Sequence, residues 1–282
     1  MKFTSSALIC TALAVSGCGS SSGGGPRYAQ PGDVLANGDS FPVQDVKRYV
    51  EVDGTQSLKD QTIGFSISDD GNTVYIAQNH KNYVLTWNSV ANRYEQVGAS
   101  FFFDSSSANV VQLAFFQDFV GTGYQNVGSF VFGYETDPTQ INPATAGGNA
   151  TFTGEASIGV FINEQNGYGG GPVTLNAVFG TQTITGTMNV SHDPAGGGNL
   201  TSFPDSIITI NPAGTPNISG NKFNTDLSIA FTPVPGPTVT IAETGLTGGF
   251  YGVNAVAVGA TFWAEGDVDG DTLLIQGGLT AE

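Results

Sequence analysis

The sequence predicts an all-β protein in which a small N-terminal β-rich domain precedes an eight-stranded or nine-stranded antiparallel β-barrel. From residue 147 onward, apolar and polar residues alternate in short runs that glycine-rich turns separate. This is the pattern of half-buried strands. No helical period lies between the runs, and short strands at regular spacing close into a barrel or a sandwich. Glycines inside the runs, such as Gly154 and Gly186, relieve crowding where a barrel bends, so we expect a small filled barrel.

The alternation defines each barrel strand in turn. The expected strands span residues 150–161, 173–179, 183–190, 206–210, 218–223, 227–231, 248–253, 256–263 and 272–279. Gly180-Thr181-Gln182 and Asp269-Gly270 lie where tight turns are needed. Side chains of one parity should fill one core: Phe152, Leu175, Phe179, Ile184, Met188, Phe231, Phe250 and Phe262.

Residues 46–146 are expected to form the smaller β domain. Strands at 64–68 and 73–77 flank Asp69-Asp70-Gly71-Asn72, which has the residues of a hairpin turn. Strands at 83–87 and 94–97 flank a second hairpin. Further strands are expected at 101–103, 110–116 and 129–134, while a short helix over 108–119 stays open.

Four segments carry a resemblance to a known family. They are FVFGYETDP (130–138), GGNATFTGEA (147–156), LTGGFYGVNAVAVGATFWAEG (246–266) and LLIQGGL (273–279). In this order they resemble the barrel domain of transferrin-binding protein B-like surface lipoproteins, with Ala260 where the family commonly has a glycine. The match covers the C-terminal half well and the N-terminal half more loosely. It implies a handle domain at 46–146, a barrel at 147–282, and capture of an iron source (haem or an iron-carrier protein) or of another solute or protein partner.

The N-terminus reads as a lipoprotein signal. Met1-Lys2 is basic, and the apolar run 7–15 is too short to span a bilayer. Val15-Ser16-Gly17-Cys18 has the form of a lipobox, so residues 1–17 are the expected signal peptide and Cys18 the lipidated residue. The alternative is an ordinary secretory signal with a chance cysteine. Residues 18–45, rich in Ser, Gly and Pro, are expected to form a flexible tether rather than a packed loop.

This N-terminus predicts a chain anchored by lipid to the bacterial outer membrane and facing outward. In the resembling family, export to the surface often depends on an outer-membrane translocon for lipoproteins. Cys10 leaves with the signal, so the mature chain has no intramolecular disulfide. It must be stabilised by burial of its core.

Charge excludes some classes of partner. The chain has 24 acidic and 8 basic residues, a net charge of −16. From residue 147 on, eleven acidic residues accompany a single lysine, Lys222. Nucleic-acid binding and a polybasic membrane patch are therefore excluded. A solvated acidic surface is favoured over a field that steers a basic partner.

Candidate ligand-binding residues are few. His80 is the better of the two histidines because Tyr83 and Trp87 lie close by in the sequence, and the three could hold a flat ligand. Tyr168, in the glycine-rich segment 166–171 that is expected to be an inter-strand loop, completes the set. The simpler hypotheses are a solvated histidine and a pair of aromatic core residues. His192-Asp193-Pro194 is expected to be an ordinary turn.

No catalytic or metal-binding motif is found. The sequence lacks a metal-ligand cluster and a nucleophile–base pair, so no enzyme activity and no cofactor are predicted, and haem or iron would be a ligand. The segment 267–271 has calcium-loop residues at the wrong spacing, which favours an Asp-Gly hairpin turn. Two functions remain: a surface binding protein, or a structural or adhesive lipoprotein without a small ligand. An integral outer-membrane barrel is a poorer third, because the strands are short and the aromatic residues scattered.

Overall fold

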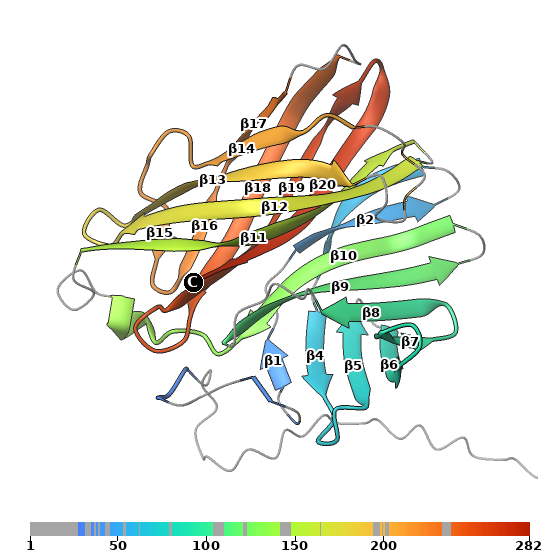
Figure 1. Cartoon of the computed structure of the whole chain (residues 1–282), viewed down its shortest axis with the longest axis horizontal. Helices are drawn as coiled ribbons and strands as arrows, with labels where there is room; N and C mark the ends of the chain where they lie inside the picture. Colours follow the sequence, from blue (N-terminus) through green and yellow to red (C-terminus); the bar gives the residue numbers. More distant parts are fainter. Residues whose placement is uncertain are drawn as a thin grey trace, which may run out of the picture.

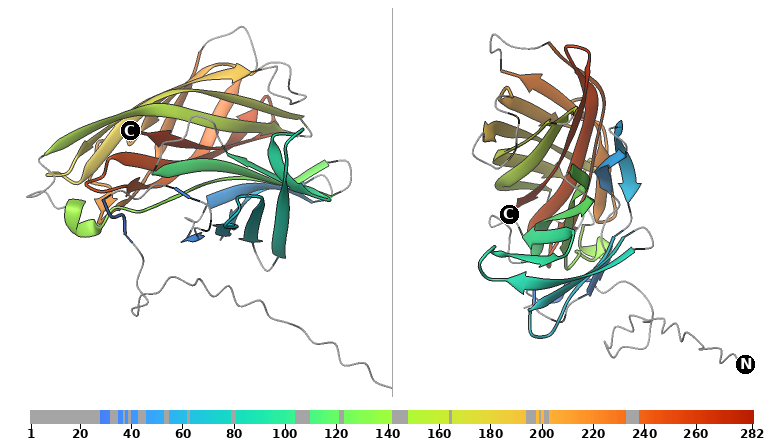
Figure 2. Two further views of the ribbon diagram at one scale, coloured as in Figure 1. Left: turned by 60° about the horizontal axis from the view of Figure 1, so that its bottom comes forward. Right: turned by 90° about the vertical axis from the view of Figure 1, so that its right-hand side faces the viewer.

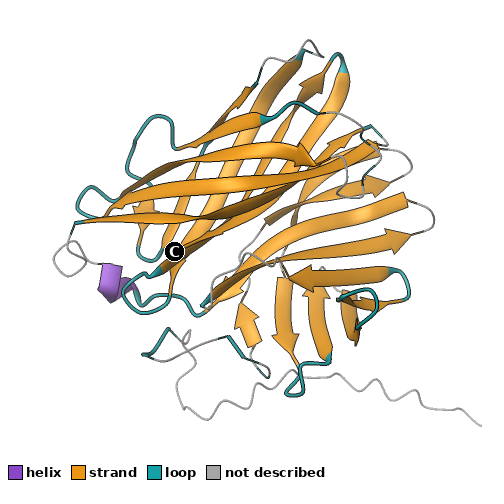
Figure 3. Cartoon of the chain, viewed as in Figure 1, coloured by secondary structure: helices purple, strands orange, loops and turns teal. Residues whose placement is uncertain are grey.

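The computed structural model describes residues 28–31, 35–36, 38, 40–42, 46–52, 55–61, 63–78, 81–103, 110–120, 123–141, 148–163, 165–193, 198, 200, 203–232 and 238–282. The expected signal peptide, Cys18 and His80 lie outside these residues. Among the described residues the chain folds into two curled antiparallel sheets, so the all-β prediction is confirmed (Figures 1 and 3). No helix in this part of the chain has the length and apolar content needed to cross a membrane.

The N-terminal half builds sheet A. Its strands are β1 (Ser40–Pro42), β2 (Val46–Val52), β3 (Thr55–Gln61), β4 (Ile63–Ile67), β5 (Thr73–Gln78), β6 (Lys81–Asn88), β7 (Arg93–Gln96), β8 (Ala99–Phe103), β9 (Val111–Val120) and β10 (Gly123–Gly133). Their order across the sheet is β1-β4-β5-β6-β7-β8-β9-β10-β2-β3. A 3-10 turn, η1 (Pro138–Ile141), follows on the way to the second sheet.

The C-terminal half builds sheet B. Its strands are β11 (Asn149–Ile162), β12 (Gln165–Val178), β13 (Thr183–Asp193), β14 (Ser206–Ile210), β15 (Ile218–Ser219), β16 (Lys222–Thr225), β17 (Leu227–Phe231), β18 (Val239–Tyr251), β19 (Ala257–Val268) and β20 (Asp271–Ala281). The order is β15-β16-β18-β19-β20-β11-β12-β13-β14-β17. Strands β11–β14 and β17–β20 of this sheet curl into a barrel-like wall, as Figure 1 shows.

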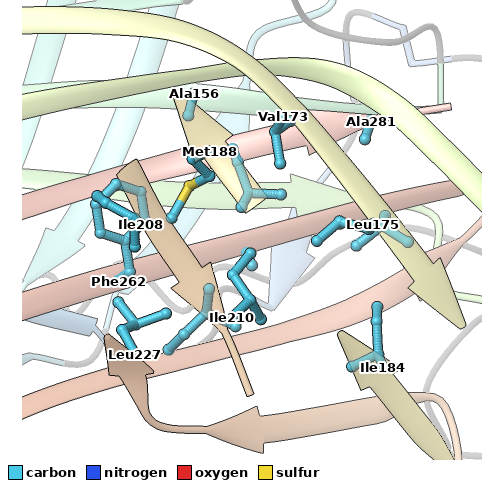
Figure 4. Close-up of a cluster of buried hydrophobic side chains, with 14 of the residues drawn as sticks. Ala156, Val173, Leu175, Ile184, Met188, Ile208, Ile210, Leu227, Phe262 and Ala281 are labelled. Carbon is cyan, nitrogen blue, oxygen red and sulfur yellow. The ribbon is translucent and has the colours of Figure 1, made fainter. Parts of the chain in front are cut away.

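A single apolar cluster fills the space inside sheet B (Figure 4). Phe152, Leu175, Phe179, Ile184, Met188, Phe250 and Phe262 are all buried in it, and Phe231 packs against it half-buried. The shared core predicted from strand alternation is therefore confirmed. Phe250 lies at its centre, since its ring contacts those of Phe152, Phe179 and Phe223.

The barrel wall is joined between β17 and β18 by a side chain. Thr244 Oγ1 accepts a hydrogen bond from Leu227 N at 2.9 Å and donates one to Leu227 O at 3.0 Å. One threonine hydroxyl thus satisfies both backbone groups of Leu227 where β17 meets β18.

Sheet A packs on the outside of sheet B with β9 and β10 against β19 and β20 (Figure 2). Val111, Leu113, Val131, Tyr251 and Ala257 form one buried cluster at this interface. A second joins Leu58, Val127, Phe161 and Leu274. Glycine makes the close approach feasible, because a Cβ at Gly259 would overlap the side chain of Val131 and one at Gly278 that of Leu113.

The segment between the sheets is tied to sheet B. Thr136 N donates to Phe250 O at 2.9 Å, and Thr136 Oγ1 donates to Gly252 O at 2.7 Å. Glu135 forms an ion pair with Lys222, the one lysine of the barrel region. Ala29, only 2% exposed, donates its N–H to Glu135 O at 2.8 Å. The connection between the sheets therefore also holds the N-terminal segment.

Part of the segment that was expected to be a flexible tether is a strand. Ser40–Pro42, within the 18–45 segment, is β1 and pairs with β4 through Phe41↔Phe65. Phe41 is 5% exposed and its ring lies 5.3 Å from that of Phe132. Burial of this one aromatic residue outweighs the Ser, Gly and Pro content of the segment.

Two further expectations need correction. Segment 166–171 is not a loop but part of β12, paired on one side with β11 and on the other with β13. The open possibility of a helix over 108–119 is resolved as strand β9, both of whose faces are buried. Strands β2 and β3 lie in segments where no strand was predicted.

Candidate recognition surface

Tyr83 is a core residue. It is 5% exposed, and its ring centroid lies 4.7 Å from that of Phe116 in an edge-on contact. Its hydroxyl donates to Asp118 Oδ2 at 2.7 Å, and Lys81 Nζ binds the same oxygen at 3.1 Å. Of the two hypotheses for Tyr83, the structure supports the core one, because both the ring and its polar tip already have partners within sheet A.

Trp87, four residues further along β6, lies at the surface. It is 38% exposed, and its ring stands edge-on to Tyr94 at 5.0 Å. One face of the indole is thus supported by the sheet while the rest meets solvent. Trp87 remains a candidate contact residue.

Tyr168 lies on the other sheet. It is half-buried in β12, opposite Gly159 of β11, and its hydroxyl accepts a hydrogen bond from Asn166 Nδ2 at 3.2 Å. The structure does not bring Tyr168 together with Trp87 into one site. The expectation that segment 166–171 is an inter-strand loop is therefore wrong, while a ligand contact at Tyr168 stays a prediction.

His192 is packed rather than solvated. It belongs to β13, and its Nε2 lies 3.2 Å from Leu200 O. Its ring centroid is 6.5 Å from that of Phe203. The expected turn at His192-Asp193 is thus the end of a strand, and the ring is held by its neighbours.

The structure groups Trp87 with two hairpin turns at one end of sheet A, residues 68–72 and 88–93, which we call the hairpin tip. The first turn is organised by Asp70. Its Oδ1 accepts from Ser68 Oγ at 2.6 Å and from Asn72 N at 3.0 Å, and its Oδ2 accepts from Asn72 Nδ2 at 3.1 Å. These bonds, led by that from Ser68, lower the pKa of Asp70 to about 2.

The second turn is organised by Asn88. Its Oδ1 accepts from Val90 N at 3.0 Å and Ala91 N at 3.2 Å, an Asx turn. Its Nδ2 donates to Glu95 Oε1, whose other oxygen accepts from Arg93 Nε at 3.0 Å. The Asn88 and Arg93 bonds lower the pKa of Glu95. The turn holds Val90 outward, 95% exposed.

The two turns are also bonded to each other. Tyr94 Oη donates to Gly71 O at 2.7 Å, and Trp87 N donates to Asn72 O at 2.9 Å. Burial, and then the charge of Asp70, raise the pKa of Tyr94, so its hydroxyl stays protonated as a donor. The hairpin tip is therefore a preformed surface that displays Trp87 and Val90. A rigid contact surface of this kind loses little conformational entropy when a partner binds.

Val90 is a candidate contact residue that the sequence prediction missed. Its signal is a β-branched apolar residue inside a hairpin turn, between Asn88 and Asn92, where polar residues and glycine normally stand. Asn92 takes the left-handed conformation, with φ of 52°.

The barrel hairpin at 267–271 is a turn. Asp269 and Gly270 have φ of 53° and 96°, as a two-residue hairpin loop of this type requires. Gly270 N donates to Asp267 Oδ1 at 2.7 Å, so this carboxylate caps the turn. Across the described residues, no three His, Cys, Asp or Glu side chains gather as a metal site would need.

Comparison with known proteins finds a likeness in fold. No family model and no curated protein matches the sequence. Among solved structures, a variant of transferrin binding protein B from Haemophilus parasuis superposes with a TM-score of 0.50 and 13% identity. It covers 86% of this chain and 44% of that one. Intact Ap-TbpB, with N and C lobes, gives a TM-score of 0.50 and 14% identity over 85% of this chain and 46% of that one.

The chain therefore has a fold like that of transferrin binding protein B and spans less than half the length of those proteins. At such identity the likeness establishes the fold alone.

Proposed function

We propose that this chain is a lipid-anchored bacterial surface protein that captures a protein partner, in the manner of transferrin-binding protein B-like lipoproteins, and catalyses no reaction. The observation that carries the proposal is the hairpin tip. Its two turns are locked by side-chain hydrogen bonds, and they expose Trp87 and Val90. Exposed tryptophan on a rigid support is typical of residues that dominate binding energy.

The fold supports the choice of partner. Two structures with this fold are transferrin-binding proteins. An iron-carrier protein such as transferrin is accordingly the first partner to test. Haem is the alternative iron source, and its support rests on His80 and the sequence alone.

Immobilised full chain and soluble iron-loaded transferrin test the capture hypothesis by interferometry. Trp87→Ala with Val90→Ala should weaken binding by about 30-fold or more, the effect of removing a strong contact residue. Ile207→Ala is the matched control, because Ile207 is 49% exposed on β14 of the other sheet. If neither transferrin nor haem is retained, the structural or adhesive function gains over capture.

The proposed localisation at the outer membrane rests on lipidation of Cys18. Three acyl chains on one cysteine exceed the two-signal requirement for stable anchoring. We expect Cys18→Ala to leave the membrane fraction, and protease treatment of whole cells to cleave the anchored protein. A membrane-bound Cys18→Ala protein would contradict the anchor. Protection from protease would contradict surface exposure and the need for an outer-membrane translocon.

A further inference from the structure

Two separate apolar clusters join sheet A to sheet B (Figure 2). In one, Val127 of β10 packs with Leu274 of β20. In the other, Leu113 of β9 lies so close to β20 that a Cβ on Gly278 would overlap its side chain. The strands between the two clusters therefore run along each other, and the side chains on their facing sides lie in the contact between the sheets.

Ser129 stands between the two clusters on sheet A. It follows Val127 by two residues on β10 and precedes Val131 by two, and Val131 is the ladder partner of Leu113. Side chains two residues apart point to the same face of a strand, so Ser129 faces sheet B. It is 0% exposed, and among the described residues its Oγ has no hydrogen-bond partner.

Gln276 and Thr280 stand at corresponding positions on sheet B. Gln276 lies on β20 midway between Leu274 and Gly278, and Thr280 follows Gly278 by two residues. By the same alternation both side chains face sheet A. They are 1% and 2% exposed. In the described part of the chain, Gln276 Oε1 and Thr280 Oγ1 also lack a hydrogen-bond partner.

The chemistry of these three oxygens points to water as their partner. Proteins bond the great majority of buried polar atoms to other protein groups or to ordered water, because an unbonded one is costly. The near-complete burial of all three residues encloses the site against an organic ligand. Three neutral oxygens are too few for calcium, which takes roughly six to eight. A buried water molecule, by contrast, typically makes about three hydrogen bonds.

We infer that the contact between the two sheets holds bound water, which bridges Ser129, Gln276 and Thr280. The two hydroxyls can each donate to or accept from water and the amide oxygen accepts, so every one of the three oxygens gains a partner. A serine between two valines leaves room at this point, because its side chain is smaller than theirs. Since the oxygens are enclosed, the water exchanges with solvent only when the sheets part locally, and its residence time reports how often they do.

Magnetic relaxation dispersion of the water signal, which detects water held inside a protein, tests the inference on the full chain with Cys18→Ser to prevent acylation. A triple variant with Ser129→Ala, Gln276→Leu and Thr280→Val replaces the three oxygens by apolar groups of similar size. Its dispersion amplitude should fall below that of the parent. Thr187→Val is the matched control, because Thr187 is exposed on β13, and it should keep the parent amplitude.

Urea unfolding of Ser129→Ala gives a second measurement, with a variant that loses a single oxygen. If water bridges the three side chains, this variant breaks the bridge and lowers the midpoint of unfolding. If the Ser129 oxygen has no partner at all, its removal should raise the midpoint instead. Ser129→Ala also carries the dispersion measurement should the triple variant not fold.

Two results would overturn the inference. One is a dispersion amplitude that is the same in the parent and in the variants that lack these oxygens. The other is a midpoint of urea unfolding that Ser129→Ala leaves unchanged or raises. Neither result bears on transferrin or haem capture, which is measured at the hairpin tip.

Discussion

The cores of the two sheets are filled by different kinds of side chain. Sheet A fills its concave face with rings: Phe41, Phe65, Tyr83, Tyr94, Phe101, Phe116, Phe130, Phe132 and Tyr134. The rings contact one another directly, as in Phe65 and Phe132, whose centroids are 4.5 Å apart. Sheet B fills its core mainly with aliphatic residues and a smaller share of phenylalanines.

Strand length accounts for part of the difference, namely the rings that β4–β8 supply: Phe65, Tyr83, Tyr94 and Phe101. Strands β4–β8 have four to eight residues each, whereas β11 and β12 have 14. A short strand contributes only two or three inward side chains, so each must bury a large area, which aromatic rings do. Among the described residues, sheet A also carries most of the exposed large apolar side chains: Tyr75, Val84, Trp87, Val90 and Val97, against Ile207 and Val256 in the barrel half. This difference is why the proposed function places the contact residues on sheet A and treats the barrel as their support.

The prediction with the largest expected loss of stability removes one aromatic ring from the core of each sheet. Phe101→Ala in sheet A and Phe250→Ala in sheet B should each cost about 3–5 kcal/mol, because both rings are fully buried. Since buried clusters join the sheets, we expect one unfolding transition in urea, which both variants shift. Two separate transitions, each sensitive to one variant, would instead show two independent domains, as residue ranges 46–146 and 147–282 predict.

The next test addresses the interface. Gly259→Ala would push a methyl group into Val131 and Val111, and we expect a loss of about 1–3 kcal/mol from overpacking. Gly180→Ala is the control, because nothing lies within 4 Å of its would-be Cβ. Equal stabilities of the two variants by chemical denaturation would mean that the sheets do not depend on close contact at Gly259.

A smaller effect is expected where each curled sheet is held by a side chain. Thr244→Val removes both hydrogen bonds to the Leu227 backbone, and Tyr83→Phe removes the bond to Asp118. Each should cost about 0.5–1.5 kcal/mol, the net contribution of a typical hydrogen bond, because Lys81 Nζ still binds Asp118 Oδ2 in the second variant and the Leu227 bonds are only part-buried. Hydrogen exchange should accelerate locally, at β17 in the first variant and at β6 in the second. Hydrogen exchange that accelerates equally in both sheets would show that neither bond acts locally.

Much of sheet B follows from alternation, and the failures have physical causes. The strands Ser206–Ile210 and Leu227–Phe231 match their predicted bounds because each is a short run rich in β-branched or aromatic residues that follows polar turn residues, Asp205 and Asp226. The first half of β12 gave no such signal, since its glycines have no side chains to alternate. Glycine is needed there because a Cβ at Gly171 would overlap Asn189 O on the next strand. Strand β9 was ambiguous because both its faces are buried.

Less of the candidate recognition surface than of the fold could be predicted from the sequence. Tyr83 and Trp87 are both aromatic residues in the same predicted strand, so the sequence does not tell which of them is buried. Their positions along β6 decide this, because the ring of Tyr83 lies over the core and that of Trp87 at its edge. The hairpin tip depends on bonds between two turns, such as that from Tyr94 Oη to Gly71 O, which are 23 residues apart in sequence. Sequence indicates the turns themselves but not that they lock together.

The smallest effect we expect is acid sensitivity of the hairpin tip. The pKa of Asp70 falls from 3.8 to about 2 on folding, because Ser68 and Asn72 donate to the ionised carboxylate. A lowered folded-state pKa stabilises the protein above the unfolded value, and this contribution is lost as the pH falls through about 2. Urea unfolding of the parent and Asp70→Asn at about pH 6, 4 and 2 measures it. The stability gap between them should be constant down to about pH 4 and then narrow, since only the parent carries the titrating group. A gap that stays constant to pH 2 would show that Asp70 does not hold the first turn through its charge, and that the tip owes its rigidity to Tyr94 and Asn88 instead.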